Sequence, residues 1–89
     1  MSEPEDTAQQ PISLEEARER FPPMWTIYDH PKDWPDHFVV RRWYGLIREE
    51  AVILCDTLVE AREYITEQGG SVPLQRDERD DPVIIETWL

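Results

Sequence analysis

Three short runs of apolar and β-branched residues predict β-strands in the middle of the chain. They cover Met24–Tyr28, Phe38–Tyr44 and Ala51–Cys55, and each is rich in side chains that favour an extended backbone. Gly45 opens a turn between the second and third runs, at a spacing that suits an antiparallel hairpin. The segment between the first two runs holds two prolines and three aspartates, so we expect a loop there.

A helical spacing of apolar residues predicts a short helix near the N-terminus. Ser13 is followed three residues later by Glu16, which is the pattern of a capping box. Pro22 and Pro23 then end the helix, because proline lacks the backbone N–H and disfavours the helical conformation of the residue before it.

A second, longer helix is predicted from Thr57 to Gln68. Thr57 and Glu60 form its capping box, and Gly69 follows its last residue, where a helix commonly ends. Three apolar residues of this helix, Leu58, Ala61 and Ile65, fall on one face, which we expect to be buried. The predicted core combines this face with the third strand, and it contains Leu58, Ile65, Val52 and Leu54.

The remaining segments complete a prediction of fold class. If residues 71–75 form a strand, we expect it at an edge of the sheet, because Pro73 cannot donate a ladder hydrogen bond. We expect residues 82–89 to form a last strand. The order of elements predicts an α+β fold: an antiparallel-rich sheet of about four to five strands, one main helix packed on one face, and a short N-terminal helix. We expect residues 1–10 to be a disordered acidic tail and 11–89 to be a single α+β domain.

The net charge of the chain limits the kinds of molecule that it can attract electrostatically. Twenty acidic residues against nine basic ones give a net charge of −11 among 89 residues. This charge excludes non-specific attraction to nucleic acid or to anionic lipid, and a charged partner is expected to be basic. No apolar run is long enough to span a membrane, and a single cysteine excludes an internal disulfide, so we expect a cytoplasmic location.

The loop Asp29–His37 holds both histidines and three aspartates, so it is the place where a metal or acid–base site would assemble. Two imidazoles and a carboxylate can bind a metal, but no short helical spacing fixes these ligands on one face. We therefore favour a proline-stiffened turn with solvated histidines, no metal and no cofactor. A small metal-binding module or enzyme centred on this loop stays open as an alternative.

Cys55 and the glycines give little support for other chemistry. Cys55 lies at the end of an apolar strand beside Asp56, and both features oppose formation of a thiolate, so we interpret it as a buried structural cysteine. The only Gly-Gly pair follows a helix instead of preceding one, so no glycine-rich phosphate loop supports nucleotide binding.

A basic and aromatic stretch offers a second alternative, a nucleic-acid-binding sheet that uses Arg41, Arg42 and Trp43. Strand alternation opposes it, because it sends the even-numbered residues from Phe38 to Tyr44 to one face and the odd-numbered ones to the other. The arginines would then cover apolar surface and pair with nearby glutamates.

The most distinctive feature is the layout of acidic residues. Glu60, Glu63 and Glu67 form a stripe on the predicted outer face of the second helix. Acidic residues outside that helix could extend the surface: Glu49, Glu50, Asp77, Glu78, Asp80 and Asp81. We expect a non-catalytic interaction protein whose partner-binding residues are Glu60, Glu63, Glu67, Asp77, Glu78, Asp80 and Asp81. Its expected partner is a basic nucleic-acid-binding protein or complex, with no direct binding of nucleic acid or membrane; the oligomeric state stays open.

The two ends of Met24–Leu89 resemble a family of small, uncharacterised proteobacterial proteins. The likeness rests on Met24–Pro31, with Trp25-Thr26-Ile27-Tyr28 within it, and on Asp80-Asp81-Pro82 and Trp88-Leu89 near the end. This chain differs by the 23 residues that precede Met24, and the resemblance implies no functional residue. In size and charge alone, the chain is also similar to small acidic phage-encoded inhibitors that mimic nucleic acid, anti-CRISPR proteins among them.

Overall fold

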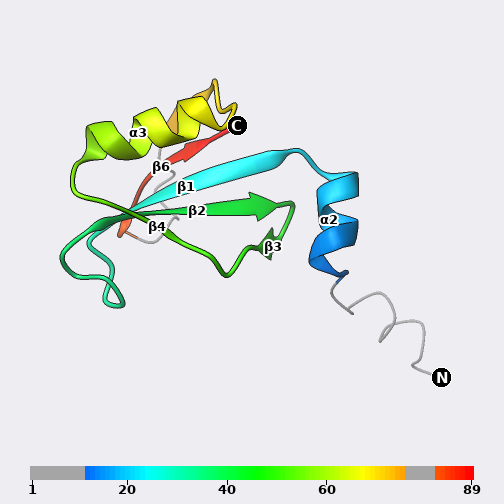
Figure 1. Cartoon of the computed structure of the whole chain (residues 1–89), viewed down its shortest axis with the longest axis horizontal. Coiled ribbons are helices and arrows are strands. Elements are labelled where there is room, and N and C mark those ends of the chain that lie inside the picture. The colour runs from blue at the N-terminus through cyan, green and yellow to red at the C-terminus, as the bar shows by residue number, and fades with distance from the viewer. Residues whose placement is uncertain (1–11, 76–81) are drawn as a thin grey trace.

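The fold is α+β, with six antiparallel strands and two helices in the part of the chain described, residues 12–75 and 82–89 (Figure 1). The structure is a computed structural model. In chain order the elements are α2 (Leu14–Arg20), β1 (Pro23–Asp29), β2 (Phe38–Tyr44), β3 (Ile47–Arg48), β4 (Ile53–Cys55), α3 (Leu58–Glu67), β5 (Pro73–Gln75) and β6 (Ile84–Trp88). The predicted fold class is confirmed.

The sheet is ordered β3-β2-β1-β6-β5, and β4 also pairs with β2. Strand β5 therefore lies at an edge, as Pro73 predicted. Gly45, with φ of 64°, occupies the first central position of the two-residue turn from β2 to β3. The ring of Phe21 lies 2.9 Å from where a Cβ of residue 45 would be, so both backbone and space favour glycine.

The third predicted strand is shorter than expected. Strand β2 pairs first with β3 and then with β4, and the chain leaves the edge of the sheet between them. At this break the backbone N–H of Glu49 still donates to the carbonyl of Arg42, at 3.0 Å, while the Glu49 side chain is buried. The predicted run from Ala51 is thus a strand only from Ile53.

Helix α3 covers one face of the sheet (Figure 1). Its capping box is complete: the Thr57 hydroxyl accepts from the N–H of Glu60, and the Glu60 carboxylate accepts from the N–H of Thr57. Ala61 and Ile65 are fully buried, and Leu58 packs against them. The predicted bounds and buried face of this helix are confirmed.

The composition of the core differs from the prediction at β4. Ile53 and Cys55 face α3 and contribute to the core, whereas Leu54 is 40% exposed and pairs with Val39 on the opposite face. Val52 precedes the strand and is only partly buried. The expectation that Val52 and Leu54 pack with α3 was wrong, because a shift of one residue along a strand exchanges its two faces.

Helix α2 lies at one end of the sheet, against β2 and β3 (Figure 1). The Ser13 hydroxyl accepts from the N–H of Glu16 at 3.1 Å, as the capping pattern predicted. Within the described residues, neither helix is long and apolar enough to cross a membrane. The predicted disordered tail, residues 1–10, lies outside the described residues.

Replacing Ile65 by alanine tests the assignment of the buried helix face. The side chain is completely buried, so Ile65→Ala should lower the free energy of unfolding by about 2–5 kcal/mol through lost contacts and a residual cavity. Val59→Ala is the matched control on the same helix, where the side chain is 59% exposed and the expected change is below about 0.5 kcal/mol. Urea unfolding measures both. Similar changes in the two variants would contradict the assignment.

Candidate functional site

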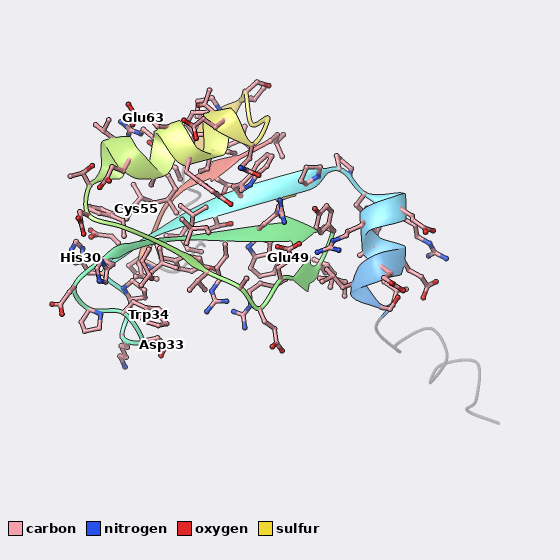
Figure 2. The ribbon with its side chains drawn as sticks, in the orientation of Figure 1. His30, Asp33, Trp34, Glu49, Cys55 and Glu63 are labelled. Carbon is pink, nitrogen blue, oxygen red and sulfur yellow. The ribbon has the colours of Figure 1, made fainter. Side chains whose placement is uncertain are left out.

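The three predicted glutamates of α3 are all exposed, but their carboxylates are not equivalent. Glu60 Oε1 accepts hydrogen bonds from the backbone N–H groups of Asp56, at 3.0 Å, and Thr57, at 3.1 Å. This carboxylate is committed to the helix cap, where it also meets the positive end of the helix dipole. Only Glu63 and Glu67 remain as an acidic pair available to a partner, and Figure 2 shows Glu63 on the outer side of α3.

Glu63 and Glu67 have no compensating cation among the residues that the structure describes. The last turn of α3 contains no basic residue, and Arg62, the only basic residue of the helix, is paired with Glu86. Val59 is exposed beside them, and an open depression is lined by Val59, Arg62, Glu63, Thr66 and Glu67. The outer face of α3 therefore combines two unpaired carboxylates with an exposed apolar side chain.

The structure describes only two of the other acidic residues that were expected to extend this surface, Glu49 and Glu50. Asp77, Glu78, Asp80 and Asp81 lie outside the described residues. Glu50 is exposed, but Glu49 is only 7% exposed and has an internal role. The expectation that Glu49 belongs to the outer acidic surface was wrong, because its carboxylate turns inward to two arginines.

Glu49 joins α2 to the sheet. Its Oε2 accepts from Arg18 Nη2 of α2 at 2.8 Å, and its Oε1 accepts from Nη2 and Nε of Arg42 in β2, at 3.0 and 3.1 Å. Burial alone would raise the pKa of Glu49, but the hydrogen bonds from Arg18 and Arg42 outweigh it, and the pKa is lowered. Both guanidinium groups also lie 5.8 Å from the ring centre of Tyr44.

Glu86 joins α3 to β6 in the same way. Arg62 donates to it through two nitrogens, and the indole N–H of Trp88 donates to its Oε1 at 3.0 Å. The hydrogen bond from Arg62 lowers the pKa of Glu86, against the opposing effect of burial. Two carboxylates thus use three arginines to fix both helices to the sheet.

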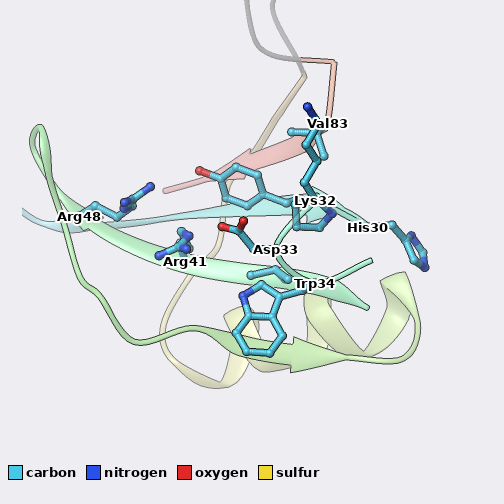
Figure 3. Close-up of a pocket in the computed structure, with 10 residues that line it drawn as sticks. His30, Lys32, Asp33, Trp34, Arg41, Arg48 and Val83 are labelled. Atoms are coloured by element: carbon cyan, nitrogen blue, oxygen red, sulfur yellow. The ribbon is translucent and has the colours of Figure 1, made fainter. Parts of the chain in front are cut away.

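A hollow of about 450 Å³ lies on the sheet face opposite α3. Its charged lining comes from the β1–β2 loop, which supplies Lys32 and Asp33, and from the strands, which supply Arg41 and Arg48 (Figure 3). No ion pair or hydrogen bond engages the side chains of Lys32, Arg41 and Arg48 within the described residues; Arg48 lies 5.9 Å from the ring centre of Trp43. The aromatic residues of the lining, His30 aside, are Tyr28 and Trp34.

The loop reaches this hollow because it reverses direction at His30. The backbone of His30 has φ of 51°, in the left-handed region that histidine tolerates better than most residues. Its N–H donates to the carbonyl of His37 at 3.1 Å, and its ring packs edge-on against Phe38 at 4.7 Å between centres. Val39 is 1% exposed on the same face as the hollow and contributes to its lining.

The metal-binding alternative finds no support in the geometry of the loop. His30 Nδ1 lies 2.5 Å from Asp29 Oδ1, whereas His37 Nδ1 lies 3.6 Å from Asp56 Oδ1, so the two imidazoles face different carboxylates. Among residues 12–75 and 82–89, no three histidine, cysteine, aspartate or glutamate side chains are grouped to hold a metal.

Cys55 is buried, as expected. Burial raises the pKa of its thiol, and the nearby carboxylates of Glu60 and Asp56 raise it further. The thiolate, which is the nucleophilic form, is therefore disfavoured at neutral pH.

The structure separates the residues of the predicted nucleic-acid-binding sheet. Arg41 and Trp43 lie on the face of the hollow, whereas Arg42 lies on the other face with Glu49. Sequence reasoning grouped all three and placed Arg48 in the same basic stretch, but it did not connect this stretch with Lys32, Asp33 and Trp34 of the loop. The period of two along β2 already separates Arg41 from Arg42, but no local signal shows that the loop folds back over Val39.

Comparison of the chain with protein-family models, curated proteins and solved structures finds no match. The resemblance of Met24–Leu89 to small proteobacterial proteins therefore stays a prediction.

The Glu49 ion pairs predict that acid destabilises the fold. A carboxylate whose pKa is lowered on folding stabilises the protein fully above its unfolded pKa of about 4.3, and this stabilisation is lost as the pH falls through the folded pKa. Glu49→Gln should lower the free energy of unfolding at pH 7 by about 1.5–3 kcal/mol, and the difference from the natural chain should shrink below about pH 4.

The measurement is urea unfolding of the natural chain and Glu49→Gln between pH 7 and pH 3. Glu50→Gln removes the same charge from an exposed neighbour, and its unfolding free energy should run parallel to that of the natural chain. A Glu49→Gln curve that also runs parallel to the natural one would contradict a stabilising role for the ionised carboxylate.

Proposed function

We propose that the protein is a non-catalytic interaction protein whose outer α3 face docks on a basic, nucleic-acid-binding surface of a partner protein and competes with nucleic acid for it. The observation that carries this proposal is the uncompensated pair Glu63 and Glu67. Both carboxylates are exposed on one helix face, and the described residues supply no cation for either.

This arrangement is unfavourable for the isolated helix. Like charges four residues apart repel one another, which costs about 0.2–0.5 kcal/mol. Glu67 also lies at the last helical residue, where the negative end of the helix dipole opposes a carboxylate. A cationic partner would relieve both effects, so the placement favours a surface built for binding over one that only serves solubility.

Val59 adds an apolar contact to the charged pair. Its side chain is 59% exposed and lines the same depression as Glu63 and Glu67. In protein interfaces, charged groups mainly steer association and apolar groups that are desolvated contribute to affinity. The α3 face offers both within two helical turns.

The enzyme alternative has weaker support than this interaction surface. The Cys55 thiol is buried with a raised pKa, and the two histidines of the loop face separate carboxylates. A nucleophile is commonly activated by a base within hydrogen-bonding reach or by a lowered pKa, and among the described residues Cys55 has neither.

Charge reversal on α3 tests the proposal. Glu63→Lys with Glu67→Lys changes the net charge by +2 at each position, from −11 to −7. Glu15→Lys with Glu19→Lys on α2 is the matched control, because it makes the same charge change four residues apart on another exposed helix face. Nucleic-acid-binding proteins retained by the immobilised chain are identified, and displacement of labelled nucleic acid from them is titrated with each variant.

The natural chain and the α2 control should displace nucleic acid at similar concentrations, whereas the α3 variant should need about tenfold more or fail, because several charge pairs are lost. Equal weakening by both variants would show an effect of bulk charge and contradict a specific α3 surface. Retained proteins that keep their nucleic acid in the presence of the natural chain would contradict the competition itself.

A stability measurement on the isolated protein tests whether the position of the Glu67 carboxylate is electrostatically unfavourable. Glu67→Gln should raise the free energy of unfolding by about 0.3–1 kcal/mol, because it removes a negative charge from the C-terminal end of α3. Glu15→Gln removes a negative charge from the first turn of α2, where the dipole favours it, so its effect should have the opposite sign. Thermal and urea unfolding measure both, and a destabilising Glu67→Gln would contradict the proposal's premise.

A further inference from the structure

We propose that the hollow between the β1–β2 loop and the sheet binds a small phosphorylated aromatic compound, with the chemistry of a mononucleotide. The hollow lies on the sheet face opposite α3, so this site is separate from the proposed docking surface. Its lining joins three cations, two aromatic rings and an apolar floor in a space of about 450 Å³. Pockets for small ligands commonly measure about 300–1,000 Å³.

The lysines and arginines that form no ion pair within the described residues all line this hollow. The described residues contain seven lysines and arginines, and four of them lie in ion pairs: Arg18, Arg20, Arg42 and Arg62. The other three all line the hollow: Lys32, Arg41 and Arg48. Asp33 is the one carboxylate among the described lining residues, so their formal charges sum to +3 − 1 = +2 in a chain of net charge −11.

Unpaired arginines on a sheet suit a phosphate group. A guanidinium offers two parallel N–H donors to phosphate oxygens, and such charge-assisted hydrogen bonds are among the strongest in proteins. Arg41 projects from β2 and Arg48 from β3, while Lys32 approaches from the loop (Figure 3). The phosphate site thus uses side chains in place of a glycine-rich loop, and sequence motifs for phosphate loops do not detect it.

The aromatic side chains suit a planar ring. Trp34 is 37% exposed, and it lines the hollow together with Tyr28. Aromatic bases stack on exposed tryptophan and tyrosine rings, largely without regard to base identity. Val39 and Val83 complete the lining with apolar surface, which a hydrated ion alone would not use.

Two features hold the cations and the loop in place before a ligand arrives. Arg48 is stacked over Trp43, with its guanidinium carbon 5.9 Å from the ring centre. The loop is closed by backbone hydrogen bonds from His30 to His37, at 3.1 Å, and from Trp34 to Pro31, at 2.9 Å. A site that is already ordered loses less conformational entropy on binding.

The overall charge favours a small ligand over a nucleic-acid chain. A polymer that crossed the hollow would bring many phosphates against a protein of net charge −11, with only a local charge of +2 to receive them. A single nucleotide keeps its phosphates within the cationic patch. The smaller cavity at Trp25 and Tyr64 is a weaker candidate, because its charged groups, Arg42 and Glu49, already pair with one another.

Calorimetric titration of the full chain at low salt tests the assignment with four probes: adenosine diphosphate, pyrophosphate, adenosine and an oligothymidylate. Adenosine diphosphate should bind, and pyrophosphate and adenosine should each bind about tenfold more weakly or not measurably, because each offers half of the contacts. Binding of the oligothymidylate without adenosine diphosphate would overturn the small-ligand assignment. Equal binding of pyrophosphate and adenosine diphosphate would overturn the aromatic part of the site.

Variants with matched controls locate the binding. Lys32→Gln and Arg41→Gln should each weaken adenosine diphosphate binding by about tenfold, whereas Arg20→Gln on α2 removes the same charge and should change it less than twofold. Lys32 is exposed on the loop, so its variant keeps the test valid if Arg41→Gln destabilises the fold.

Asp33→Asn tests the same site by an expected gain of affinity instead of a loss. It removes the one carboxylate among the described lining residues and should strengthen adenosine diphosphate binding several-fold. Asp36→Asn makes the same charge change in the same loop outside the hollow and should have little effect. Equal effects of Asp33→Asn and Asp36→Asn would overturn the site. These measurements do not involve α3, so their failure leaves the proposed docking function untouched.

Discussion

The antiparallel register between β1 and β2 is the constraint on which the two proposed functional faces depend. Seven consecutive residue pairs join the strands, from Pro23 opposite Tyr44 to Asp29 opposite Phe38. Because successive side chains of a strand point to opposite faces, this register places Ile27 with Val40 toward α3 and Thr26 with Arg41 away from it. A slip of one residue would expose the core and bury the cations, so the same pairing enforces both faces at once.

The ion pairs explain why charge is so unevenly distributed over a small acidic protein. Glu49 and Glu86 are the carboxylates least exposed to solvent in these pairs, and they pair with Arg18, Arg42 and Arg62. These pairs fix both helices to the sheet, but they leave the outer face of α3 without an unpaired cation among the described residues. Among the described residues, the arginines that remain unpaired lie on β2 and β3, on the opposite face of the sheet. Internal pairing thus separates an acidic face from a cationic one.

Much of the fold could be predicted from the sequence, because its signals are local. The capping box at Thr57, the prolines after α2 and the alternation in β2 each depend on a few neighbouring residues. The sequence does not predict which residues of β4 face the core, because every residue of Ala51–Cys55 is apolar and either face could be buried. The exposure of Glu63 and Glu67 could be predicted from helical periodicity, but the contact of Glu60 with its cap removes it from the proposed docking surface. The cationic hollow depends on contacts between a loop and two strands. The hydrophobic periodicity of the sequence does not predict contacts between such distant segments.

We expect the α3 face and the hollow to respond differently to salt. The difference follows from how much of the electrostatic energy at each face comes from nearby charges and how much comes from the rest of the chain. Association of α3 with a basic partner gains from the whole field of the −11 chain, so screening beyond a Debye length of about 8–10 Å weakens it. An anionic ligand at the hollow is attracted by three nearby cations but repelled by the rest of the chain. Salt screens the distant repulsion more fully than the close attraction, so the two effects partly cancel. One charge distribution can therefore make partner docking more sensitive to ionic strength than ligand binding on the opposite face.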